Sequence, residues 1–387
     1  MRVLFTIFDS DLGGRQRVAL QVMQGLRSRG AELYAAVRGT GPLITAVETL
    51  GVKTESVPTR RVKDPRGYLA LARLVARIQP DLIYDNGAAF IAATVGKFWG
   101  IPVVLHEHSI LGFVGSRLRR GLERTMMRWE YSWASAVIAV SDAACRAIID
   151  LGVPAGRVKL IRNGVPIDKF AAKSLHARAL VRSQLGLKDD SVVISLVARL
   201  CELKGQRMLM EAARRLPWGE LKLHFLFVGR DEERGGAYEA YLKRLAGELG
   251  LADCVTFTGH RDDIPGVLWA SDMTILPSNA EACGLSILES MAAGKPVIAT
   301  ATAGAREILE DGITGLIVPI GNPTALASAI LRLVKDPNLR ATLAANAYAH
   351  VSANYSEEVF LQNVMNVLSR AAPQCASLGA GAIAERP

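Results

Sequence analysis

Apolar runs of strand length alternate with amphipathic stretches along almost the whole chain, and this alternation constrains the fold more than any other feature. Strands are predicted at 2–8, 32–37, 81–85, 102–106, 136–140 and 158–162, and near 192–198, 222–228, 254–258, 273–277, 296–300 and 315–318. Helices are predicted between the first six, near 14–29, 67–78, 88–99, 116–134 and 142–150. Such alternation indicates parallel sheets with crossover helices, an α/β fold wound twice. A chain of 387 residues is long enough for two domains.

The turn cluster Asn163-Gly-Val-Pro-Ile-Asp168 lies near the midpoint, where a domain boundary is expected. Residues 372–387 are rich in Gly and Ala and show no periodicity, which is typical of a flexible tail.

The segment from Pro277 to Thr300 carries the clearest chemical signal. The apolar run Met273 to Leu276, directly before it, is predicted as a strand, and a helix is predicted from Gly284 to Ala293. Glu281 is therefore expected on a strand-to-helix loop and Glu289 on the second turn of the helix. The amides of residues 283–285 are then unpaired at a helix N-terminus, where a phosphate binds well. Two carboxylates that flank an anion site suit a ligand with a central phosphate and hydroxyls at both ends, which is the shape of a sugar nucleotide.

This segment resembles the donor signature of the retaining GT-B glycosyltransferases, the large group 1 type, family 4, of bacterial cell-surface sugar transferases. The matching residues are Glu281 to Gly294, Lys295-Pro-Val-Ile-Ala-Thr, Gly304, Glu307, Asp311-Gly312 and Thr314 to Pro319, with Arg199, Lys204 and Gly229 upstream. The resemblance covers nearly the whole chain. It implies two Rossmann-like domains facing a cleft: an acceptor-side domain, 1–168, to which a last helix near 356–371 returns, and a donor domain, 169–355.

Arg199 and Lys204 are the expected phosphate-binding cations. Arg199 ends the predicted strand Val192 to Ala198, at the edge where open α/β sheets bind ligands, and Lys204 begins the next helix. In the resembled family the matching residues neutralise the donor diphosphate, because fixed cations stabilise the charge that the leaving group gains. Catalysis is therefore expected to need no metal ion, and the nucleoside-diphosphate sugar is a co-substrate with no further cofactor.

His106 and His108 end the predicted strand 102–106 and are expected at the same kind of sheet edge. The resemblance maps the family's catalytic histidine onto His108, which would hold a donor-sugar hydroxyl or assist near the anomeric carbon, with His106 as the second candidate. A metal-binding pair is the alternative, but the sequence shows no third ligand. A purely structural pair is the other alternative.

The remaining expected substrate contacts come from loops at the sheet edges. They are Gly14, Gly229, Arg261, Cys283, Gly284 and Leu285, together with the charged residues already named. Two positions depart from the family pattern: Arg15-Gln-Arg17 follows Gly14 where an acidic residue is common, and Cys283 replaces an aromatic. Asp9-Ser-Asp11 spells the metal-binding D-x-D of another glycosyltransferase fold, but in the wrong domain for that role.

Charge is concentrated in the first half of the chain. Residues 1–178 hold 26 basic and 14 acidic residues, whereas the rest hold 20 and 23. The segment 115–129 has five arginines, of which Arg117, Arg120, Arg124 and Arg128 share a helical face. This pattern favours an anionic membrane surface as a partner, with a solvated helix packed by its apolar stripe as the alternative. No aromatic platform accompanies this charge, so nucleic acid is not expected as a partner.

The expected location is the cytoplasm, with peripheral attachment to the inner membrane face. The sequence shows no run of 18 apolar residues and no signal-peptide pattern, and its five cysteines form no C-x-x-C pair. Scattered cysteines fit free thiols in a reducing compartment.

The function predicted from these features is transfer of a hexose-type sugar to a hydroxyl of a lipid-linked or cell-envelope glycan. The donor would be a UDP-, GDP- or ADP-sugar, which the sequence does not distinguish. Two alternatives stay open: a sugar-nucleotide epimerase of the same fold, and a non-catalytic sugar-nucleotide-binding module.

Overall fold

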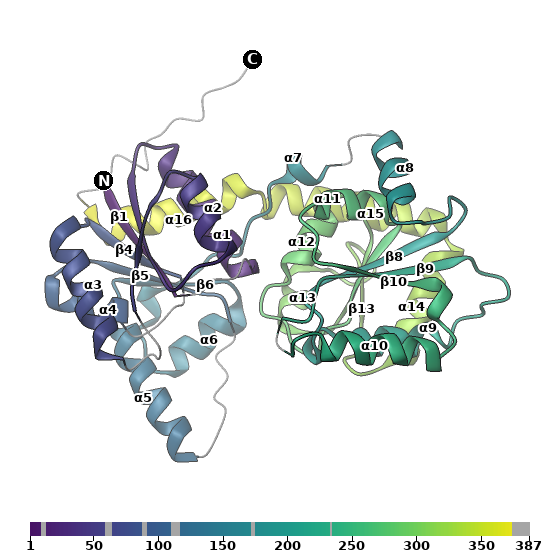
Figure 1. The fold of residues 1–387 in the computed structure, drawn as a ribbon, viewed down its shortest axis with the longest axis horizontal. Coiled ribbons are helices and arrows are strands. Elements are labelled where there is room, and N and C mark those ends of the chain that lie inside the picture. The colour runs from purple at the N-terminus through teal and green to yellow at the C-terminus, as the bar shows by residue number, and fades with distance from the viewer. Residues whose placement is uncertain are drawn as a thin grey trace. The chain divides into compact units, whose positions relative to one another are not determined.

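The computed structural model describes residues 1–8, 13–58, 64–86, 91–109, 117–171, 175–232 and 234–373. The chain divides into two compact units (Figure 1). Unit 1 comprises Met1–Gly164 and Glu357–Pro387, and unit 2 comprises Val165–Ser356. The sequence placed the boundary after Asp168, within the same turn-rich segment. Most of the expected tail lies outside the described residues.

The described part of unit 1 contains a parallel sheet with strand order β3-β2-β1-β4-β5-β6-β7. The strands are β1 Arg2–Ile7, β2 Glu32–Val37, β3 Lys53–Ser56, β4 Leu82–Asp85, β5 Val103–Glu107, β6 Ala136–Ala139 and β7 Val158–Leu160. The helices are α1 Gly14–Arg27, α2 Pro42–Thr49, α3 Pro65–Ile78, α4 Ile91–Trp99, α5 Arg117–Trp133, α6 Asp142–Asp150, the short η1 Ala155–Arg157, and α16 Glu357–Ala371. The order of the strands reverses between β1 and β4, as in a doubly wound sheet.

Two elements of unit 1 were not predicted from the sequence, namely α2 and β3. Strand β3 reads Lys-Thr-Glu-Ser and contains no fully buried residue, so it lacks the apolar pattern by which strands are recognised. It is an edge strand that pairs with β2 through its backbone. Helix α2 has only eight residues and is short for a periodicity argument.

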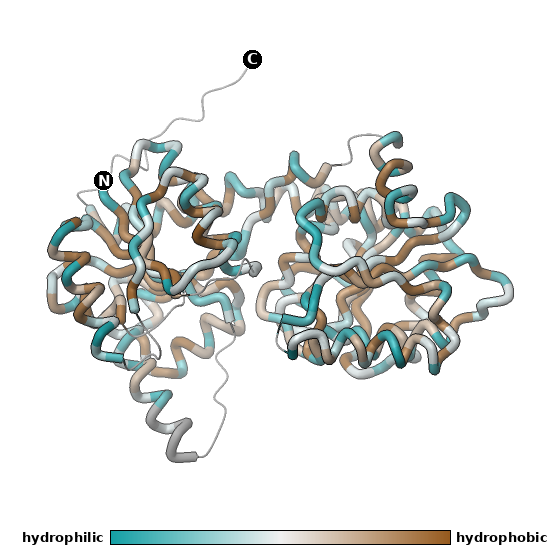
Figure 2. Tube along the Cα trace, viewed as in Figure 1, coloured by the Kyte–Doolittle hydropathy of each residue, from teal (hydrophilic) through white to brown (hydrophobic). Residues whose placement is uncertain are grey.

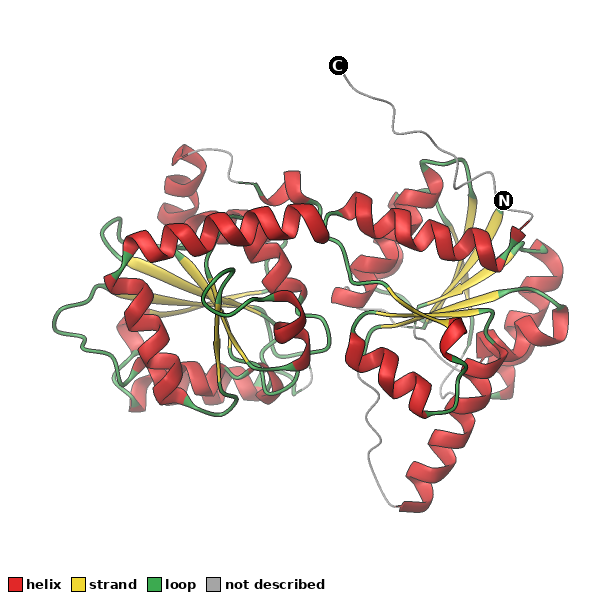
Figure 3. Cartoon of the chain, turned by 180° about the vertical axis from the view of Figure 1, so that it is seen from behind, coloured by secondary structure: helices red, strands yellow, loops and turns green. Residues whose placement is uncertain are grey.

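Helices cover both faces of the unit 1 sheet (Figures 1 and 3). Buried apolar residues of α3, α4 and α6 form a core on one face. On the other face α16 packs against α1, where Gly25 allows close approach: a Cβ atom there would lie 2.8 Å from Leu361 Cδ2. The last helix of the chain therefore belongs to unit 1.

The described part of unit 2 contains a parallel sheet with strand order β10-β9-β8-β11-β12-β13. The strands are β8 Val192–Val197, β9 Leu223–Val228, β10 Val255–Gly259, β11 Met273–Leu276, β12 Val297–Thr300 and β13 Leu316–Val318. The helices are α7 Ile167–Phe170, α8 Leu175–Gln184, α9 Gln206–Ala213, α10 Ala237–Glu248, α11 Ile264–Ala270, α12 Leu285–Ala292, α13 Ala303–Ile308, α14 Pro323–Lys335 and α15 Pro337–Asn354, with short turns η2 Glu202–Lys204 and η3 Ala252–Cys254.

Apolar side chains fill both sides of this second sheet. One core joins the strands to α9, α10 and α14, and the other joins them to α11, α12 and α15. Figure 2 shows the strands of this sheet as mostly hydrophobic stretches, with hydrophilic residues alternating along the surrounding helices and loops. Strands buried on both faces read as continuous apolar runs, which explains why they were recognisable in the sequence.

In both sheets the strand order reverses at one point. The carboxyl ends of the strands near this point position the candidate site residues. In unit 2 this point lies between β8 and β11, which are neighbours in the sheet although far apart in the chain. Open parallel sheets bind ligands at such switch points, because the connections that follow the two strands leave toward opposite faces. Among the described residues, no helix is long and apolar enough to cross a bilayer.

Candidate functional site

A close backbone contact holds together the two loops at the switch point of unit 2. Gly205, between η2 and α9, has φ +71°, and a Cβ atom there would lie 1.9 Å from the carbonyl oxygen of Pro277. Only glycine fits this position, because it combines a left-handed backbone with direct contact against another backbone. The loop after β8 is thereby pressed onto the loop after β11.

This contact brings Lys204 to Glu281. The Lys204 ammonium donates to Glu281 Oε2, and the two side chains are only 18% and 15% exposed. A charge pair this poorly solvated is costly to separate unless another charge replaces one partner. The sequence predicted separate roles for the two residues, and the structure shows them as one ion pair.

Hydrogen bonds to the backbone fix the geometry around this pair. The Asn279 amide donates to Leu203 O (2.8 Å), and its side chain donates to Glu202 O (3.1 Å). The buried Gln206 side chain donates to the carbonyl of Arg199 (2.8 Å) and so holds the end of β8 against the start of α9. Arg199 itself is exposed, two residues beyond β8. Asn279 and Gln206 were missed in the sequence, where nothing distinguishes them from ordinary loop amides.

Helix α12 begins one residue after the predicted start. Its N-cap, Gly284, is left-handed with φ +67° and provides no side-chain cap, while the amide of Ile287 donates to Gly284 O (2.8 Å). Leu285 is the first helical residue, and Glu289 lies on the second turn, half-buried.

Gly304 has a steric role in this loop. A Cβ atom on it would lie 2.8–3.0 Å from backbone atoms of Ala282 and Cys283, and its own amide donates to Glu281 O (2.9 Å). Gly304 therefore holds α13 directly against the loop that carries Glu281.

The other residues predicted for the donor side lie at the same sheet edge. Gly229 follows β9, and a Cβ atom there would lie 2.0 Å from the carbonyl oxygen of Ala198. Arg261 follows β10 and makes a two-point contact with Asp263, with Nε to Oδ1 at 2.8 Å and an NH group to Oδ2 at 2.6 Å. The structure therefore orients Arg261 toward the start of α11 through this pair.

In unit 1 the two histidines stack at the carboxyl end of β5. Their ring centroids are 4.0 Å apart. His106 is fully buried, and its Nδ1 shares a 2.5 Å hydrogen bond with the Tyr84 hydroxyl. His108 Nε2 donates to Asn86 Oδ1 (2.8 Å), and Asn86 in turn donates to the carbonyl of Arg15 (3.3 Å). Asn86 follows β4, so polar residues at a strand's carboxyl end were the signal that could have found it.

Burial keeps both imidazoles neutral. It lowers the pKa of His106 to about 3. Burial, together with His106 and Arg15, lowers the pKa of His108 well below its usual value. Because its Nε2–H is donated to Asn86, a neutral His108 keeps Nδ1 as a hydrogen-bond acceptor for a hydroxyl at ordinary pH, which an imidazolium lacks.

Two acidic residues of unit 1, one on β5 and one on α5, are held by hydrogen bonds or by burial. Glu107, the last residue of β5, accepts from the Tyr131 hydroxyl and from the amide (2.8 Å) and hydroxyl (2.6 Å) of Ser109. Glu130 on α5 is 8% exposed, and burial followed by the charges of Asp85 and Glu107 raises its pKa well above the usual range.

The remaining sequence predictions concern the loop before α1, the cysteines and a metal site. Gly14 begins α1 with Gly13 as its N-cap, whereas Asp9 and Asp11 lie outside the described residues. The cysteines in the described chain, at 145, 201, 254 and 283, form no disulfide bonds with one another. Over the same residues, no group of three or more His, Cys, Asp or Glu side chains could hold a metal ion.

Comparison with known proteins agrees with this arrangement. The profile of "Glycosyl transferases group 1" matches residues 178–350, and that of "Glycosyltransferase Family 4" matches residues 12–169. The alpha-D-kanosaminyltransferase of Streptomyces kanamyceticus is 30% identical over 73% of this chain and 74% of its own. The D-inositol 3-phosphate glycosyltransferase of Salinispora arenicola is 27% identical over 93% of this chain and 88% of its own.

Solved structures show the same relationship. The crystal structure of Anabaena HepE in complex with UDP and glucose superposes with a TM-score of 0.83 at 29% identity, covering 95% of this chain and 99% of HepE. Two Rossmann-like units with parallel sheets, with charged groups at the carboxyl edge of the second, define the GT-B class of transferase. The chain belongs to the group 1, family 4 glycosyltransferases. Transferase activity is thereby favoured over the epimerase and the non-catalytic module that the sequence left open.

Replacing Gly205 by alanine should destabilise unit 2 strongly. The added Cβ meets Pro277 O, so we expect the free energy of unfolding to fall by roughly 2–5 kcal/mol. Gly250→Ala is the matched control, because Gly250 has φ +70° but no atom within 4 Å of the added Cβ; it should cost only about 1–2 kcal/mol. Equal losses for the two variants in urea unfolding would contradict a steric role for Gly205.

Replacing Glu130 by glutamine should remove a loss of stability that grows as pH rises. Because the pKa of Glu130 is raised on folding, the folded state keeps a proton that the unfolded state releases, so this group's contribution to stability falls as pH rises above 4.5. Glutamine cannot ionise. Between about pH 5 and pH 8, the melting temperature of Glu130→Gln should therefore increase relative to that of the parent chain as pH rises. Glu248→Gln, at an exposed position, should leave the profile unchanged; parallel profiles for all three proteins would refute the burial argument.

Proposed function

We propose that this glycosyltransferase moves a hexose-type sugar from a nucleoside diphosphate to an acceptor hydroxyl and retains the anomeric configuration. The observation that carries the proposal is the shielded Lys204–Glu281 pair at the switch point of unit 2. In the reaction, a bond forms between the acceptor oxygen and the anomeric carbon, and the bond from that carbon to the diphosphate breaks. The diphosphate gains negative charge as it leaves, and a fixed cation stabilises that charge.

The Lys204–Glu281 ion pair suits a phosphate-binding site in its ligand-free state. Without a donor, Glu281 balances the ammonium of Lys204 in poorly solvated surroundings. A diphosphate can take over Lys204, which releases the Glu281 carboxylate to accept hydrogen bonds from sugar hydroxyls. Arg199 would supply a second cation, and the amides at residues 283–285 a helix N-terminus. We propose that this set makes a metal ion unnecessary.

The remaining roles follow the same proposal. Glu289 would accept hydrogen bonds from the ribose hydroxyls, and Gly229, Arg261, Cys283, Gly284 and Leu285 would line the donor site. His108 would act at the donor sugar as a neutral imidazole, with His106 behind it, and Gly14 would lie on the acceptor side. HepE has been crystallised with UDP and with UDP-glucose. These complexes support UDP rather than GDP or ADP as the nucleotide of the donor.

Substitution of Lys204 tests the donor site. Lys204→Ala should lower turnover of a UDP-hexose by roughly 10²–10³-fold, the usual scale for losing one charge-stabilising contact in a transition state. The same variant leaves Glu281 unpaired, so its stability should fall too. In Lys204→Met/Glu281→Gln both charges are absent, and stability should return while turnover stays low. Recovery of turnover together with stability would show that the pair is merely structural.

We also propose that the acceptor is a lipid-linked or cell-envelope glycan and that unit 1 meets an anionic membrane. Large aromatic side chains on α4 and α5 support this, since Phe98 is 81% exposed and Trp129 is 60% exposed. Aromatic rings and basic residues together favour a lipid headgroup region. Part of the basic face of α5 is already used, because Arg124 donates to the carbonyl of Asp150 at the end of α6 (2.8 Å).

Vesicle co-sedimentation measures this attachment. Replacing Arg117, Arg119 and Arg120 by Ser should release the protein from anionic vesicles, because each basic residue near such a surface contributes about 1 kcal/mol. The control replaces three basic residues elsewhere in unit 1, Lys53, Arg73 and Arg77, with the same change in charge. Equal behaviour of the two triple variants, or equal binding to neutral vesicles, would argue for a soluble acceptor.

A further inference from the structure

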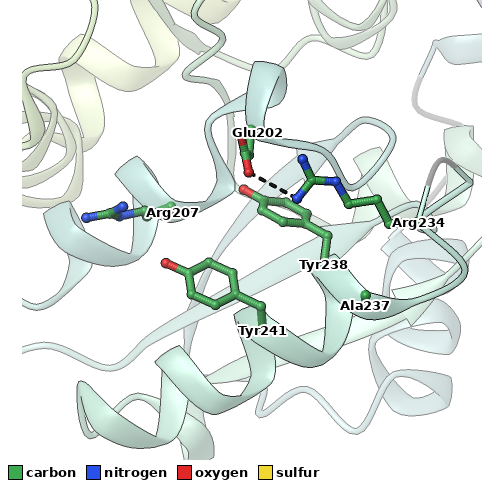
Figure 4. Close-up of a pocket in the computed structure, with 6 residues that line it drawn as sticks. All are labelled: Glu202, Arg207, Arg234, Ala237, Tyr238 and Tyr241. Atoms are coloured by element: carbon green, nitrogen blue, oxygen red, sulfur yellow. Dashed lines mark hydrogen bonds and ion pairs between the residues drawn. The ribbon is translucent and has the colours of Figure 1, made fainter.

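Unit 2 contains an open pocket that shares no residue with the proposed donor site. It lies between η2 and the helices α9 and α10 and has a volume of about 320 Å³ (Figure 4). Its lining residues are Glu202, Arg207, Arg234, Ala237, Tyr238 and Tyr241. Ligand cavities in proteins usually measure about 300–1,000 Å³, so this one has room for a small molecule.

Two tyrosines form one wall of the cavity. Tyr238 and Tyr241 lie on successive turns of α10, with ring centroids 5.8 Å apart and an angle of 31° between the rings. Tyr238 is 5% exposed and packs in the core of unit 2, and Tyr241 packs against that core. Tyr238 is almost fully covered by this packing, so Tyr241 supplies most of the accessible aromatic surface. A fixed aromatic ring can pack against the C–H groups of a sugar without further loss of side-chain freedom.

Two guanidinium groups border the same space. Arg207 Nε donates to Glu211 Oε1 (2.8 Å), and an Arg234 NH group donates to Glu202 Oε1 (3.2 Å). A guanidinium carries five N–H donors, and each of these pairs occupies one of them. Planar N–H pairs match the oxygens of a phosphate, so both arginines can bind an anion with their remaining donors.

The ion pair between Arg234 and Glu202 can readily exchange with a ligand. Their side chains are 59% and 69% exposed, and exposed pairs of this kind contribute little to stability. Figure 4 shows the pair beside the Tyr238 ring, with Tyr241 on the next turn. Glu202 therefore places a carboxylate acceptor next to an aromatic wall, where sugar hydroxyls would meet it.

We propose that this cavity binds a sugar monophosphate. The sugar ring lies against Tyr238 and Tyr241, the phosphate is held by Arg207 and Arg234, and Glu202 accepts from a sugar hydroxyl. The site is separate from the nucleotide site, because Lys204, on the same turn as Glu202, directs its ammonium to Glu281. The proposal does not depend on the identity of the donor or the acceptor.

Calorimetric titration of the full chain with glucose 6-phosphate tests the proposal. We expect saturable binding that becomes roughly 10–100-fold weaker in Arg207→Ala/Arg234→Ala, a loss of about 1.4–2.7 kcal/mol at about 1.4 kcal/mol for each tenfold change. Both side chains are more than half exposed, so the variant should fold. Arg244→Ala, an exposed arginine on α10 outside the cavity, should bind as the parent does.

Three further titrations separate the sources of binding. Lys204→Ala should keep its affinity for glucose 6-phosphate, whereas a loss would assign the binding to the donor site and overturn the proposal. Inorganic phosphate and glucose should each bind more weakly than glucose 6-phosphate. Equal affinity for inorganic phosphate would reduce the cavity to a simple anion site, and absence of binding at millimolar glucose 6-phosphate would reject it.

Discussion

The contact of Gly205 with the carbonyl of Pro277 is the constraint on which the proposed donor site of unit 2 depends. It presses together two loops that follow neighbouring strands but lie more than seventy residues apart in the chain. The ion pair between Lys204 and Glu281 exists because of this approach. The amide and the side chain of Asn279 then fix both loops by donating to backbone carbonyls. The charged groups are thus held before a ligand arrives, which is what electrostatic stabilisation of a leaving diphosphate requires.

The two units handle charge in different ways. Unit 2 places opposite charges together at the sheet edge, where we propose that a phosphate exchanges with a carboxylate. In unit 1, burial instead favours the neutral form of three groups, because it lowers the pKa of His106 and of His108 and raises the pKa of Glu130. Neutral groups can exchange hydrogen bonds with hydroxyls, and cations can hold phosphates. This division fits a reaction that joins a hydroxyl to a sugar released from a diphosphate.

The sequence predicted most of the fold because strands buried on both faces are continuous apolar runs. It failed at β3, whose four polar residues carry no apolar pattern although the strand pairs with β2. It predicted Lys204 and Glu281 as site residues but not their pairing, because nothing local records which loops meet. The cavity with Tyr238 and Tyr241 was not predicted either, since an aromatic pair on a helix looks like ordinary core.

The sequence by itself determined the α/β class, the two-domain organisation it predicted and the family, because periodicity and the signature around Glu281 are local properties of the chain. Only the tertiary structure decided which charges meet. Parallel strand order brings the ends of β8 and β11 side by side, and glycines without a Cβ let the backbones touch there. Ion pairs and the neutrality of buried histidines depend on distance and on exclusion of water, and folding alone sets both.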